Sequence, residues 1–314
     1  MNVATFITHS MVPPWHFQTR HADLLRQLIP GADVTVCHHQ DEFAQALRDA
    51  DVALAWVFRQ EWFGLAPRLR VLSTPAAGKD YFHVTPPPSV TMLNGHFHGE
   101  IIAETVVGML LGMTRAILPA ATTYAGLPWP RAELTPLMRT LRGASVTILG
   151  FGHIGRWIGQ LLKPFGTTVR GLVRHPETAP VPDWFDGDDA LFGPDQLDAI
   201  LPLTQHLILA LPSTTGTDRL LDARRLALLP QDATVINVGR GNALDEEALL
   251  DALRARRLLG AALDVFAHEP LPTDDPIRTC PRLWTLPHAS AIADNYLELY
   301  VRELAVDLDR LGVR

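Results

Sequence analysis

The chain has 314 residues, about twice the length of a typical domain, so we expect two domains. Hydrophobic residues make up 47% of the chain and charged residues 19%, which is typical of packed cores and argues against extended disorder. Asp and Glu outnumber Lys and Arg by 34 to 27, and the net charge of −7 argues against a broad nucleic-acid-binding surface.

Three further features bear on the compartment in which the chain works. Cys37 and Cys280 are too few and too far apart for a disulfide framework or a metal site, which favours a reducing, cytoplasmic environment. The first ten residues carry no cationic leader, so we expect no secretion signal. The most apolar stretch, residues 101–118, is interrupted by Glu104 and Arg115, and it predicts a buried helix and no membrane partner.

Short apolar runs alternate with longer segments of helical period along most of the chain. In chain order, the predicted strands cover residues 3–7, 34–37, 52–56, 71–74, 90–93, 145–150, 167–173, 206–212, 233–239, 260–266 and 283–287. Strands separated by connections of helix length indicate βαβ units, in which parallel sheets carry helices on both faces. We therefore predict an α/β fold with two doubly wound parallel-sheet domains.

Two helical segments indicate where the domains divide. The stretch from Gly99 to about Ala121 is predicted to be a long helix that bridges the two sheets, and residues 290–314 have a helical pattern with no strand after it. A terminal helix of this kind is expected to return to the first domain. The predicted domains are residues 1–95 together with 290–314, and residues 96–289.

A G-x-G-x-x-G pattern directly follows a predicted strand and opens a predicted helix. Gly150 permits the tight turn, Gly152 lets a pyrophosphate approach the backbone, and Gly155 allows close packing of helix on strand. The helix that begins near His153 and Ile154 offers free N–H groups and the positive end of its dipole to phosphates. Strand, loop and helix follow in the order that a dinucleotide-binding site requires, and the alternative is an ordinary glycine-rich turn.

The residue after the next predicted strand indicates which cofactor the site prefers. An NAD site places a carboxylate about 20 residues beyond the glycines, where it accepts hydrogen bonds from the ribose. At that distance this chain has Arg174, followed by His175, and the first acid is Glu177. A guanidinium pairs well with a 2′-phosphate, so we predict NADP, with NAD possible. The alternative is a solvated loop cation.

An arginine, a glutamate and a histidine each follow a predicted strand of the second domain. They are Arg240 in Asn-Val-Gly-Arg-Gly, Glu269 in Asp-Val-Phe-Ala-His-Glu-Pro, and His288 in Leu-Pro-His-Ala-Ser. Residues beyond the carboxyl ends of the strands of a doubly wound sheet converge on the ligand crevice. Taken alone, each residue has an equally good ordinary explanation: the first as a surface arginine, the second as an acid in a loop, and the third as a histidine that caps a turn. Together, downstream of a dinucleotide loop, they predict a catalytic set.

With these motifs the chain resembles the D-2-hydroxyacid dehydrogenase family, and most closely its glyoxylate/hydroxypyruvate reductase branch. The resemblance implies a Rossmann cofactor domain, a flavodoxin-like substrate domain, and NAD(P)-dependent reduction of a small 2-keto acid such as glyoxylate or hydroxypyruvate. It implies that Arg240 holds the substrate, Glu269 supports the histidine and His288 transfers the proton. The implied cofactor contacts beyond the glycine loop are Arg174, His175, Pro212, Val238, Gly239 and Asp264.

The substrate contacts implied in the first domain are less specific. Residues 76–80 align with the family loop whose backbone amides receive the substrate carboxylate, which assigns substrate contacts to Ala77, Gly78 and Lys79. Lys79 departs from the more usual small apolar residue at its position. Trp56 ends a predicted strand and is a candidate for the pocket wall, with core packing as the alternative.

The chemistry of such a reduction calls for the same residue types. After hydride delivery to the carbonyl carbon the oxygen needs a proton. Because histidine is a residue type that titrates near neutrality, His288 can give that proton and take it back in the reverse reaction. A neighbouring carboxylate, here Glu269, favours the imidazolium and fixes which ring nitrogen faces the substrate. The planar fork of Arg240 suits a substrate carboxylate and polarises the carbonyl.

Partners and metals are predicted from weaker signals. The apolar run Val106–Met113 exceeds the need of one core and, by the same resemblance, predicts a two-fold homodimer. His96 and His98 form a His-x-His pattern, and His38 adjoins His39. A metal site needs further ligands at defined spacing, and hydride transfer to a nicotinamide needs no metal, so we predict none.

Two other functions compete with the reductase. Some relatives of this fold act as transcriptional corepressors, so a non-catalytic dinucleotide sensor is one alternative. Another is a dehydrogenase that acts on formate or phosphite. The complete Arg, Glu and His set argues against the sensor, and Glu269 argues against formate because formate-using relatives carry an uncharged amide there.

Overall fold

The structure is a computed structural model that describes residues 1–78 and 82–313. It divides into two compact units, Met1–His98 with Ile292–Arg314, and Gly99–Ala291. Each unit is built on one parallel sheet with flanking helices, so the predicted α/β fold class is confirmed. Within the described residues, no helix has both the length and the apolar character that crossing a bilayer requires.

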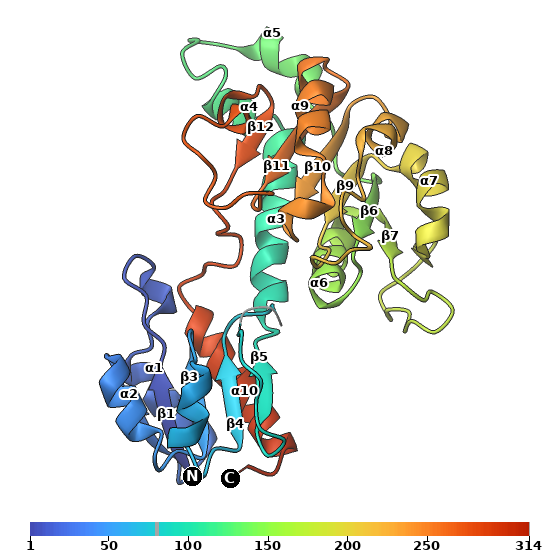
Figure 1. The fold of residues 1–314 in the computed structure, drawn as a ribbon. Helices are drawn as coiled ribbons and strands as arrows, with labels where there is room; N and C mark the ends of the chain where they lie inside the picture. Colours follow the sequence, from blue (N-terminus) through green and yellow to red (C-terminus); the bar gives the residue numbers. More distant parts are fainter. Residues whose placement is uncertain (79–81, 314) are drawn as a thin grey trace. The chain divides into compact units, whose positions relative to one another are not determined.

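The first unit carries a sheet in the order β2-β1-β3-β4-β5, which is the flavodoxin-like order. Its strands are β1 (Asn2–Phe6), β2 (Asp33–Val36), β3 (Val52–Ala55), β4 (Val71–Thr74) and β5 (Thr91–Asn94). Its helices are α1 (Thr19–Leu28), α2 (Gln40–Ala46) and α10 (Tyr296–Arg310), with 3₁₀ turns η1 (Pro13–Trp15) and η2 (Gln60–Leu65) (Figure 1). The central strands β3 and β4 are buried throughout, because an α/β sheet is covered on both faces.

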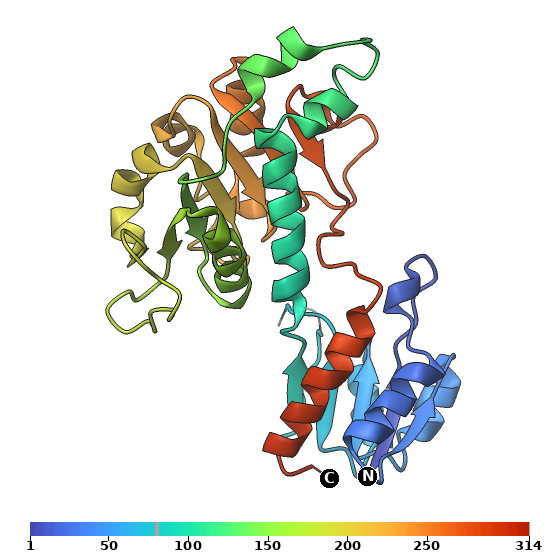
Figure 2. The same ribbon diagram turned by 180° about the vertical axis from the view of Figure 1, so that it is seen from behind.

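The last helix of the chain belongs to the first unit. Figure 2 shows α10 beside α1 on one face of the sheet, and the two helices are in contact. The buried Tyr300 Oη donates a hydrogen bond to Ser73 Oγ at 2.8 Å. Glu303 accepts hydrogen bonds from the backbone N–H groups of His96 and Phe97, at 2.8 and 3.3 Å. These contacts attach α10 to β4 and to the residues that follow β5.

The second unit carries a sheet in the order β12-β11-β10-β9-β6-β7-β8, a Rossmann order extended by one strand. Its strands are β6 (Ser145–Leu149), β7 (Thr168–Leu172), β8 (Ala190–Phe192), β9 (His206–Leu209), β10 (Ala233–Asn237), β11 (Leu258–Leu263) and β12 (Leu283–Thr285). Its helices are α3 (His98–Thr114), α4 (Ile117–Ala121), α5 (Arg131–Leu134), α6 (His153–Leu162), α7 (Leu197–Ile200), α8 (Ala223–Leu228) and α9 (Glu246–Arg254). Short 3₁₀ turns are η3 (Thr135–Leu137), η4 (Lys163–Phe165), η5 (Pro194–Gln196), η6 (Leu201–Leu203), η7 (Gly241–Ala243) and η8 (Pro276–Thr279).

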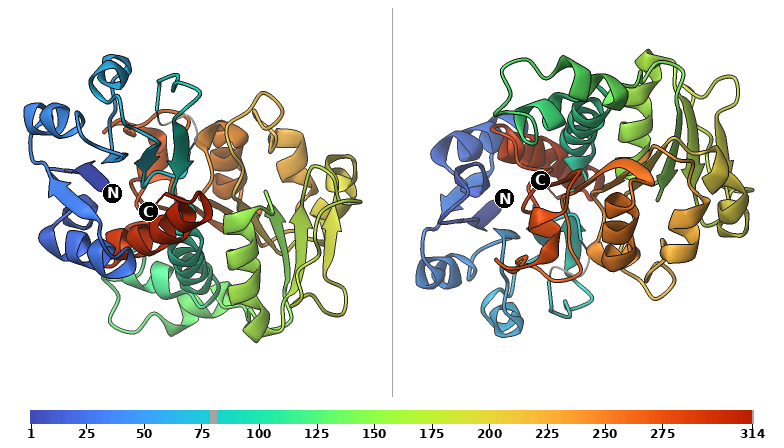
Figure 3. Two further views of the ribbon diagram at one scale, coloured as in Figure 1. Left: turned by 90° about the horizontal axis from the view of Figure 1, so that it is seen from below. Right: turned by 90° about the horizontal axis from the view of Figure 1, so that it is seen from above.

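Helices lie on both faces of the sheet of the second unit (Figure 3), and the sheet separates two hydrophobic cores. On one face, Leu110 of α3 and Ile158 of α6 are buried against the strands. On the other face, Leu253 of α9 is buried together with residues of α7 and α8. Neighbouring strand residues alternate between the two cores, as Ile208 and Leu209 of β9 do. The two cores hold the strands in place. The loops at the carboxyl ends of the strands are therefore positioned by a rigid sheet.

The structure differs from the sequence prediction at one strand and one helix. The strand β8 was not predicted, because Ala190–Phe192 is too short for a recognisable pattern. The long helix predicted from Gly99 to about Ala121 is two helices, α3 and α4. Ala116 between them adopts φ 56°, a left-handed conformation in which a helix cannot continue.

The apolar face of α3 bears on the predicted homodimer. Val106, Leu110 and Met113 are buried in the core of the second unit itself. The apolar character of this helix is therefore accounted for within one chain, and the homodimer stays a prediction.

A buried histidine in the second unit predicts a loss of stability in acid. His206 on β9 is buried, and its Nδ1 hydrogen-bonds Thr234 Oγ1 at 2.9 Å. Burial lowers the pKa of His206 from 6.5 to about 4. The unfolded chain therefore takes up this proton first, so the folded state loses stability as pH falls from about 6.5 toward about 4. Between pH 7.5 and pH 5 we expect this residue to lower the free energy of unfolding by about 2 kcal/mol.

Urea unfolding of the wild type and of His206→Gln at pH 7.5 and pH 5 measures this effect. The variant should show a smaller acid-induced decrease of the unfolding midpoint than the wild type. His175→Gln, which removes an exposed histidine of the same unit, is the control and should behave like the wild type. An equal decrease in all three proteins would contradict the assignment.

Candidate active site

The glycine loop after β6 has the geometry that a pyrophosphate requires. Gly150 adopts φ 92°, and a Cβ on it would lie 2.6 Å from the carbonyl oxygen of Ala210. A Cβ on Gly155 would lie 2.4 Å from the carbonyl oxygen of Gly150, so helix and strand meet backbone to backbone. A Cβ on Gly152 would meet nothing within 4 Å. The loop is therefore closed toward the protein and open at Gly152, where a phosphate group would fit.

The helix α6 begins directly at this opening, with Gly152 as its N-cap. His153 is exposed, and a Cβ on Gly99 would lie 3.0 Å from its ring. Ile154 is half-buried and packs against the core that α6 covers. The N–H groups of the first turn of a helix have no partners within the helix, so this end of α6 suits an anion.

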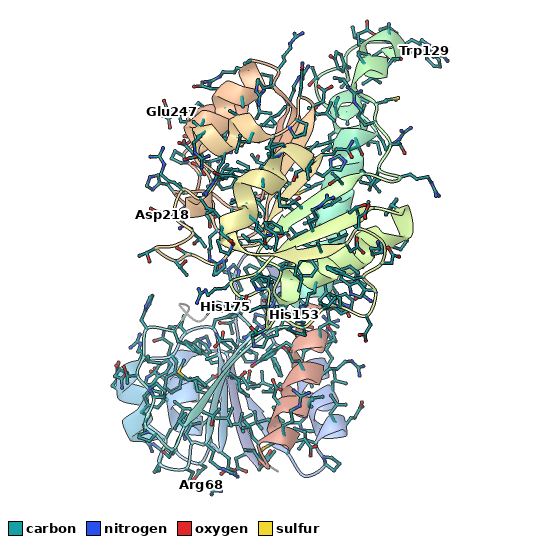
Figure 4. All side chains as sticks on the ribbon, turned by 90° about the vertical axis from the view of Figure 1, so that its right-hand side faces the viewer. Arg68, Trp129, His153, His175, Asp218 and Glu247 are labelled. Carbon is teal, nitrogen blue, oxygen red and sulfur yellow. The ribbon has the colours of Figure 1, made fainter. Side chains whose placement is uncertain are left out.

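Arg174 and His175 follow β7, the strand next to β6 in the sheet. Both side chains are exposed, and His175 Nδ1 lies 3.4 Å from Glu177 Oε1. Within the described residues, Arg174 makes no ion pair with a carboxylate. In Figure 4, His153 and His175 lie at the same end of the second unit. The predicted cofactor residues of β6 and β7 thus share one edge of the sheet.

The loops after β9 and β10 also approach each other closely. Val238 N–H donates to the carbonyl oxygen of Leu209 at 3.0 Å, which extends the strand pairing beyond β10. A Cβ on Gly239 would lie 2.5 Å from the backbone nitrogen of Leu211. Pro212 comes next, is exposed, and accepts a hydrogen bond from Thr217 Oγ1 at 2.7 Å. Only glycine fits at position 239.

Asn237 shapes the turn that carries Arg240. Its Oδ1 accepts a hydrogen bond from Gly239 N–H at 3.1 Å, and its Nδ2 donates to the carbonyl oxygen of Arg240 at 3.1 Å. Arg240 is half-buried, and its Nη1 donates to the carbonyl oxygen of Gly239 at 3.0 Å. Asn237 lies in the Asn-Val-Gly-Arg-Gly motif, but no role was predicted for it. An asparagine at the end of an apolar run, before two glycines, is the sequence signal that could have indicated this turn.

His288 and Glu269 form the pair that the sequence predicts. His288 Nδ1 lies 2.7 Å from Glu269 Oε2, and because a carboxylate only accepts, Nδ1 donates. Glu269 Oε1 accepts a second hydrogen bond from the backbone N–H of Phe266 at 2.9 Å. The His288 side chain is 53% exposed and that of Glu269 34% exposed, so a ligand can reach the pair. Glu269 follows β11 and His288 follows β12, and β11 lies between β12 and β10, the strand that precedes Arg240.

Asp264 holds the backbone on both sides of His288. It is fully buried, and its two carboxylate oxygens accept hydrogen bonds from the N–H groups of Ala289 and Ser290, at 2.6 and 3.1 Å. Its carbonyl oxygen accepts from His288 N–H at 2.8 Å. His288 itself adopts φ 51°, a left-handed conformation that costs a non-glycine residue about 1–3 kcal/mol. Asp264 therefore fixes a strained turn that presents the imidazole.

Two of the predicted substrate residues of the first unit, Ala77 and Gly78, lie in the loop after β4. Ala77 is exposed and Gly78 half-buried, and Asn94 Nδ2 donates to the carbonyl oxygen of Gly78 at 3.0 Å. Asn94 also approaches the carbonyl oxygen of Ala76 at 3.4 Å, so one amide orients this loop. Lys79 lies outside the described residues.

Trp56 belongs to an aromatic cluster of the first unit. Its Nε1 donates to the carbonyl oxygen of Trp15 at 2.9 Å, and the two rings lie 5.6 Å apart. Its ring centroid is 6.3 Å from that of Tyr296. His98, from the His-x-His pattern, hydrogen-bonds Tyr296 Oη at 2.9 Å. These contacts favour packing as one role of Trp56.

A doubly wound sheet with an open glycine loop after its first strand, and with a histidine–carboxylate pair at its strand ends, defines a nicotinamide-dinucleotide-dependent oxidoreductase. The model of the family "D-isomer specific 2-hydroxyacid dehydrogenase, NAD binding domain" matches residues 107–290. The chain belongs to this dehydrogenase family, and the resemblance inferred from its motifs is confirmed.

Relatives with assigned activities support the same placement. The chain is 33% identical over 230 residues to glyoxylate/hydroxypyruvate reductase B of Pectobacterium carotovorum, covering 71% of this chain and 69% of the relative. It is 28% identical over 264 residues to glyoxylate reductase of Thermofilum pendens, covering 80% and 75%. A solved structure of a D-isomer specific 2-hydroxyacid dehydrogenase from Xanthobacter autotrophicus, in complex with NADPH and MES, matches with a TM-score of 0.73 and 25% identity over 98% of this chain and 95% of that one.

Proposed function

We propose that the chain reduces a small 2-keto acid, such as glyoxylate or hydroxypyruvate, to the 2-hydroxy acid with NADPH. The observation that carries the proposal is the hydrogen bond of 2.7 Å between His288 Nδ1 and Glu269 Oε2, in the unit that also holds the glycine loop. The carboxylate at position 269 favours a hydroxyacid enzyme over a formate enzyme. The relatives named as glyoxylate reductases support the substrate class.

Each residue of the predicted catalytic set has a separate task in this reaction. A bound nicotinamide supplies the hydride that reaches the carbonyl carbon. Because Nδ1 of His288 is engaged by Glu269, Nε2 is the ring nitrogen that donates the proton to the carbonyl oxygen. Glu269 stabilises the imidazolium and keeps the ring in one orientation. Arg240 pairs its guanidinium with the substrate carboxylate and polarises the carbonyl.

The residues that would hold the dinucleotide lie at the edge of the sheet where the strands have their carboxyl ends. The backbone at Gly150, Gly152 and Gly155 and the start of α6 would receive the pyrophosphate. Arg174 and His175 would receive the 2′-phosphate of NADPH. The proposed contacts to the nicotinamide end are those of Pro212, Val238, Gly239 and Asp264.

In the first unit, we assign a substrate-binding role to the loop that Asn94 orients. The backbone N–H groups of Ala77 and Gly78 would bind a carboxylate. Trp56 would form part of the pocket wall, and Lys79 would contact the substrate. Ala77→Pro, which removes one N–H, would raise KM for the keto acid if this assignment holds.

The proposal also covers the compartment in which the protein works and its oligomeric state. Both cysteines, Cys37 and Cys280, are free and buried. Burial raises the pKa of Cys37 to about 11 and raises that of Cys280 above its ordinary value, so both thiols stay protonated and unreactive. These thiols suit a cytoplasmic protein. We propose a homodimer, which light scattering at several protein concentrations tests.

A single screen decides the substrate class. NADPH oxidation is followed with glyoxylate, hydroxypyruvate, pyruvate and phenylpyruvate at matched concentrations. We expect the small keto acids to give the highest kcat/KM. NADPH binding without turnover on any of them would overturn the proposal in favour of a dinucleotide sensor.

The cofactor preference gives a further prediction. Replacing Arg174 with Asp should lower kcat/KM for NADPH by about 10–100-fold, because a charge-assisted pair with the 2′-phosphate is replaced by repulsion. The same change should improve NADH, since the new carboxylate can accept hydrogen bonds from the ribose.

Arg142 provides the matched control for this change. It is exposed and precedes β6, at the opposite end of the strand from the glycine loop. Arg142→Asp should leave the ratio of the two kcat/KM values unchanged. A wild type that prefers NADH, or an Arg174→Asp variant with an unchanged ratio, would contradict the NADPH assignment.

A further inference from the structure

Glu246, the first residue of α9, contacts the loop that carries Glu269. Its Oε1 accepts a hydrogen bond from the backbone N–H of Ala267 at 2.8 Å. The preceding N–H, that of Phe266, donates to Glu269 Oε1 at 2.9 Å. Two consecutive amides of one loop are thus held by two carboxylates, one from the loop itself and one from α9.

The same peptide is also confined by Gly241. A Cβ on Gly241 would lie 1.9 Å from the carbonyl carbon of Phe266 and 2.3 Å from the nitrogen of Ala267. The peptide therefore packs directly on the backbone that follows Arg240, and it cannot move closer. The hydrogen bond to Glu246 restrains this peptide further, in addition to the burial of the Phe266 side chain in the core.

Glu246 sits in surroundings that do not favour a charge. Burial raises the pKa of its carboxyl above the usual value, the hydrogen bond from Ala267 and the charge of His268 act against this shift, and Asp275 and Asp245 add to it. A half-buried carboxylate needs compensating contacts to stay ionised. The Ala267 N–H is the hydrogen-bond donor found at its Oε1.

Helix stability alone does not account for this placement. Glu247, the next residue, is also acidic and lies in the first turn of α9, where it interacts with the helix dipole equally well. Glu247 is exposed, and Figure 4 shows it at the outer surface of the unit. What distinguishes Glu246 is its contact with Ala267.

We propose that Glu246 is a positioning residue for the reaction, which fixes the peptide between Phe266 and Ala267 and thereby holds Glu269 against His288. The proposal rests on the proposed function of that pair. The hydrogen bond from His288 Nδ1 to Glu269 Oε2 spans 2.7 Å, and a displacement of the carboxylate by about 1 Å would break it. In this proposal Glu246 acts through the loop and Glu269.

The direct test reads the tautomer of the neutral His288 ring from its ¹⁵N chemical shifts in the cofactor-free protein. The wild type should hold the proton on Nδ1, where Glu269 accepts it, whereas in Glu246→Ala the proton should move toward Nε2, because a displaced Glu269 no longer fixes it. Glu246→Gln should restore the wild-type tautomer, since its amide oxygen still accepts from Ala267. Glu246→Asp keeps the charge at the helix start but is too short to reach, so it should behave like the alanine variant. This second variant serves if Glu246→Ala does not fold.

A kinetic cycle tests whether the effect passes through Glu269. Glu246→Ala should lower kcat for keto acid reduction about 10-fold, with little change in KM and none in the Kd of NADPH. In a Glu269→Gln background the same change should cost no further activity, because residues that act through one another are not additive.

Glu247→Ala is the matched control, and it should leave both the His288 tautomer and the kinetics unchanged. Equal losses in the wild-type and Glu269→Gln backgrounds, or an unchanged His288 tautomer in Glu246→Ala and Glu246→Asp, would overturn the positioning role. A wild type that reduces none of the keto acids would overturn the proposed function instead. The NMR spectra would still report whether Glu246 holds the Glu269–His288 pair.

Discussion

Replacing His288 with Gln is expected to lower kcat/KM for 2-keto acid reduction by about 10²–10⁴-fold, the range typical of a lost general acid. Glutamine keeps a polar group near Glu269 but carries no proton to give at neutral pH. The loss should appear in kcat, because His288 acts on the carbonyl oxygen as its charge develops. The glycine loop and Arg174 follow the strands β6 and β7, so the Kd of NADPH should stay unchanged. Steady-state NADPH oxidation and a fluorescence titration of NADPH measure the two quantities.

His268→Gln is the control for this variant. His268 is exposed and precedes Glu269 in the same loop, so it matches His288 in residue type and neighbourhood. Its replacement should leave kcat/KM within about two-fold of the wild type, because within the described residues the His268 side chain is exposed and makes no hydrogen bond or ion pair. A His288→Gln variant with wild-type turnover would refute the role of the imidazole as proton donor. Loss of NADPH binding together with turnover would show that the change disturbs the unit as a whole.

Local sequence patterns were sufficient to predict the fold class because each strand is a short apolar run in a fully covered sheet. The runs at 206–212 and 233–239 contain β9 and β10, which are buried throughout. The three residues of β8 carry no such pattern. The break between α3 and α4 at Ala116 depends on a left-handed backbone conformation, which an alanine in the sequence does not predict.

The sequence predicts those site residues whose place follows from their position directly after a strand. Glycines directly after a strand, and polar residues at the ends of β10, β11 and β12, follow from the topology of a doubly wound sheet. The contacts of Asp264 with Ala289 and Ser290 join segments about 25 residues apart, and no periodicity encodes them. Glu246 is one of three consecutive acids at a helix start, Asp245 to Glu247, and only the tertiary structure shows which one meets the loop.

Gly241 ties the loop of Arg240 to the loop of Glu269, so its replacement by Ala is expected to damage both stability and catalysis. A Cβ at this position would lie 1.9 Å from the carbonyl carbon of Phe266 and 2.1 Å from its oxygen. These are backbone atoms, held by the hydrogen bonds that Glu246 and Glu269 accept from Ala267 and Phe266, so no side-chain rotation relieves the clash. The free energy of unfolding should fall by about 1–3 kcal/mol, the usual cost of overpacking.

The catalytic loss from Gly241→Ala should exceed what its stability loss explains. The loop must retreat by about 1 Å to accept the Cβ, and a misplacement of that size costs about 10²-fold in rate. Gly108→Ala is the control, because a Cβ there meets nothing within 4 Å and alanine favours a helix such as α3. We expect Gly108→Ala to be as stable as the wild type or more so, with unchanged kcat/KM. Urea unfolding and NADPH oxidation at 25 °C, where both variants remain folded, separate the two effects. If Gly241→Ala lost stability but kept full activity, the loops would be free to move apart without disturbing His288, and the rigid link between Arg240 and Glu269 would have to be abandoned.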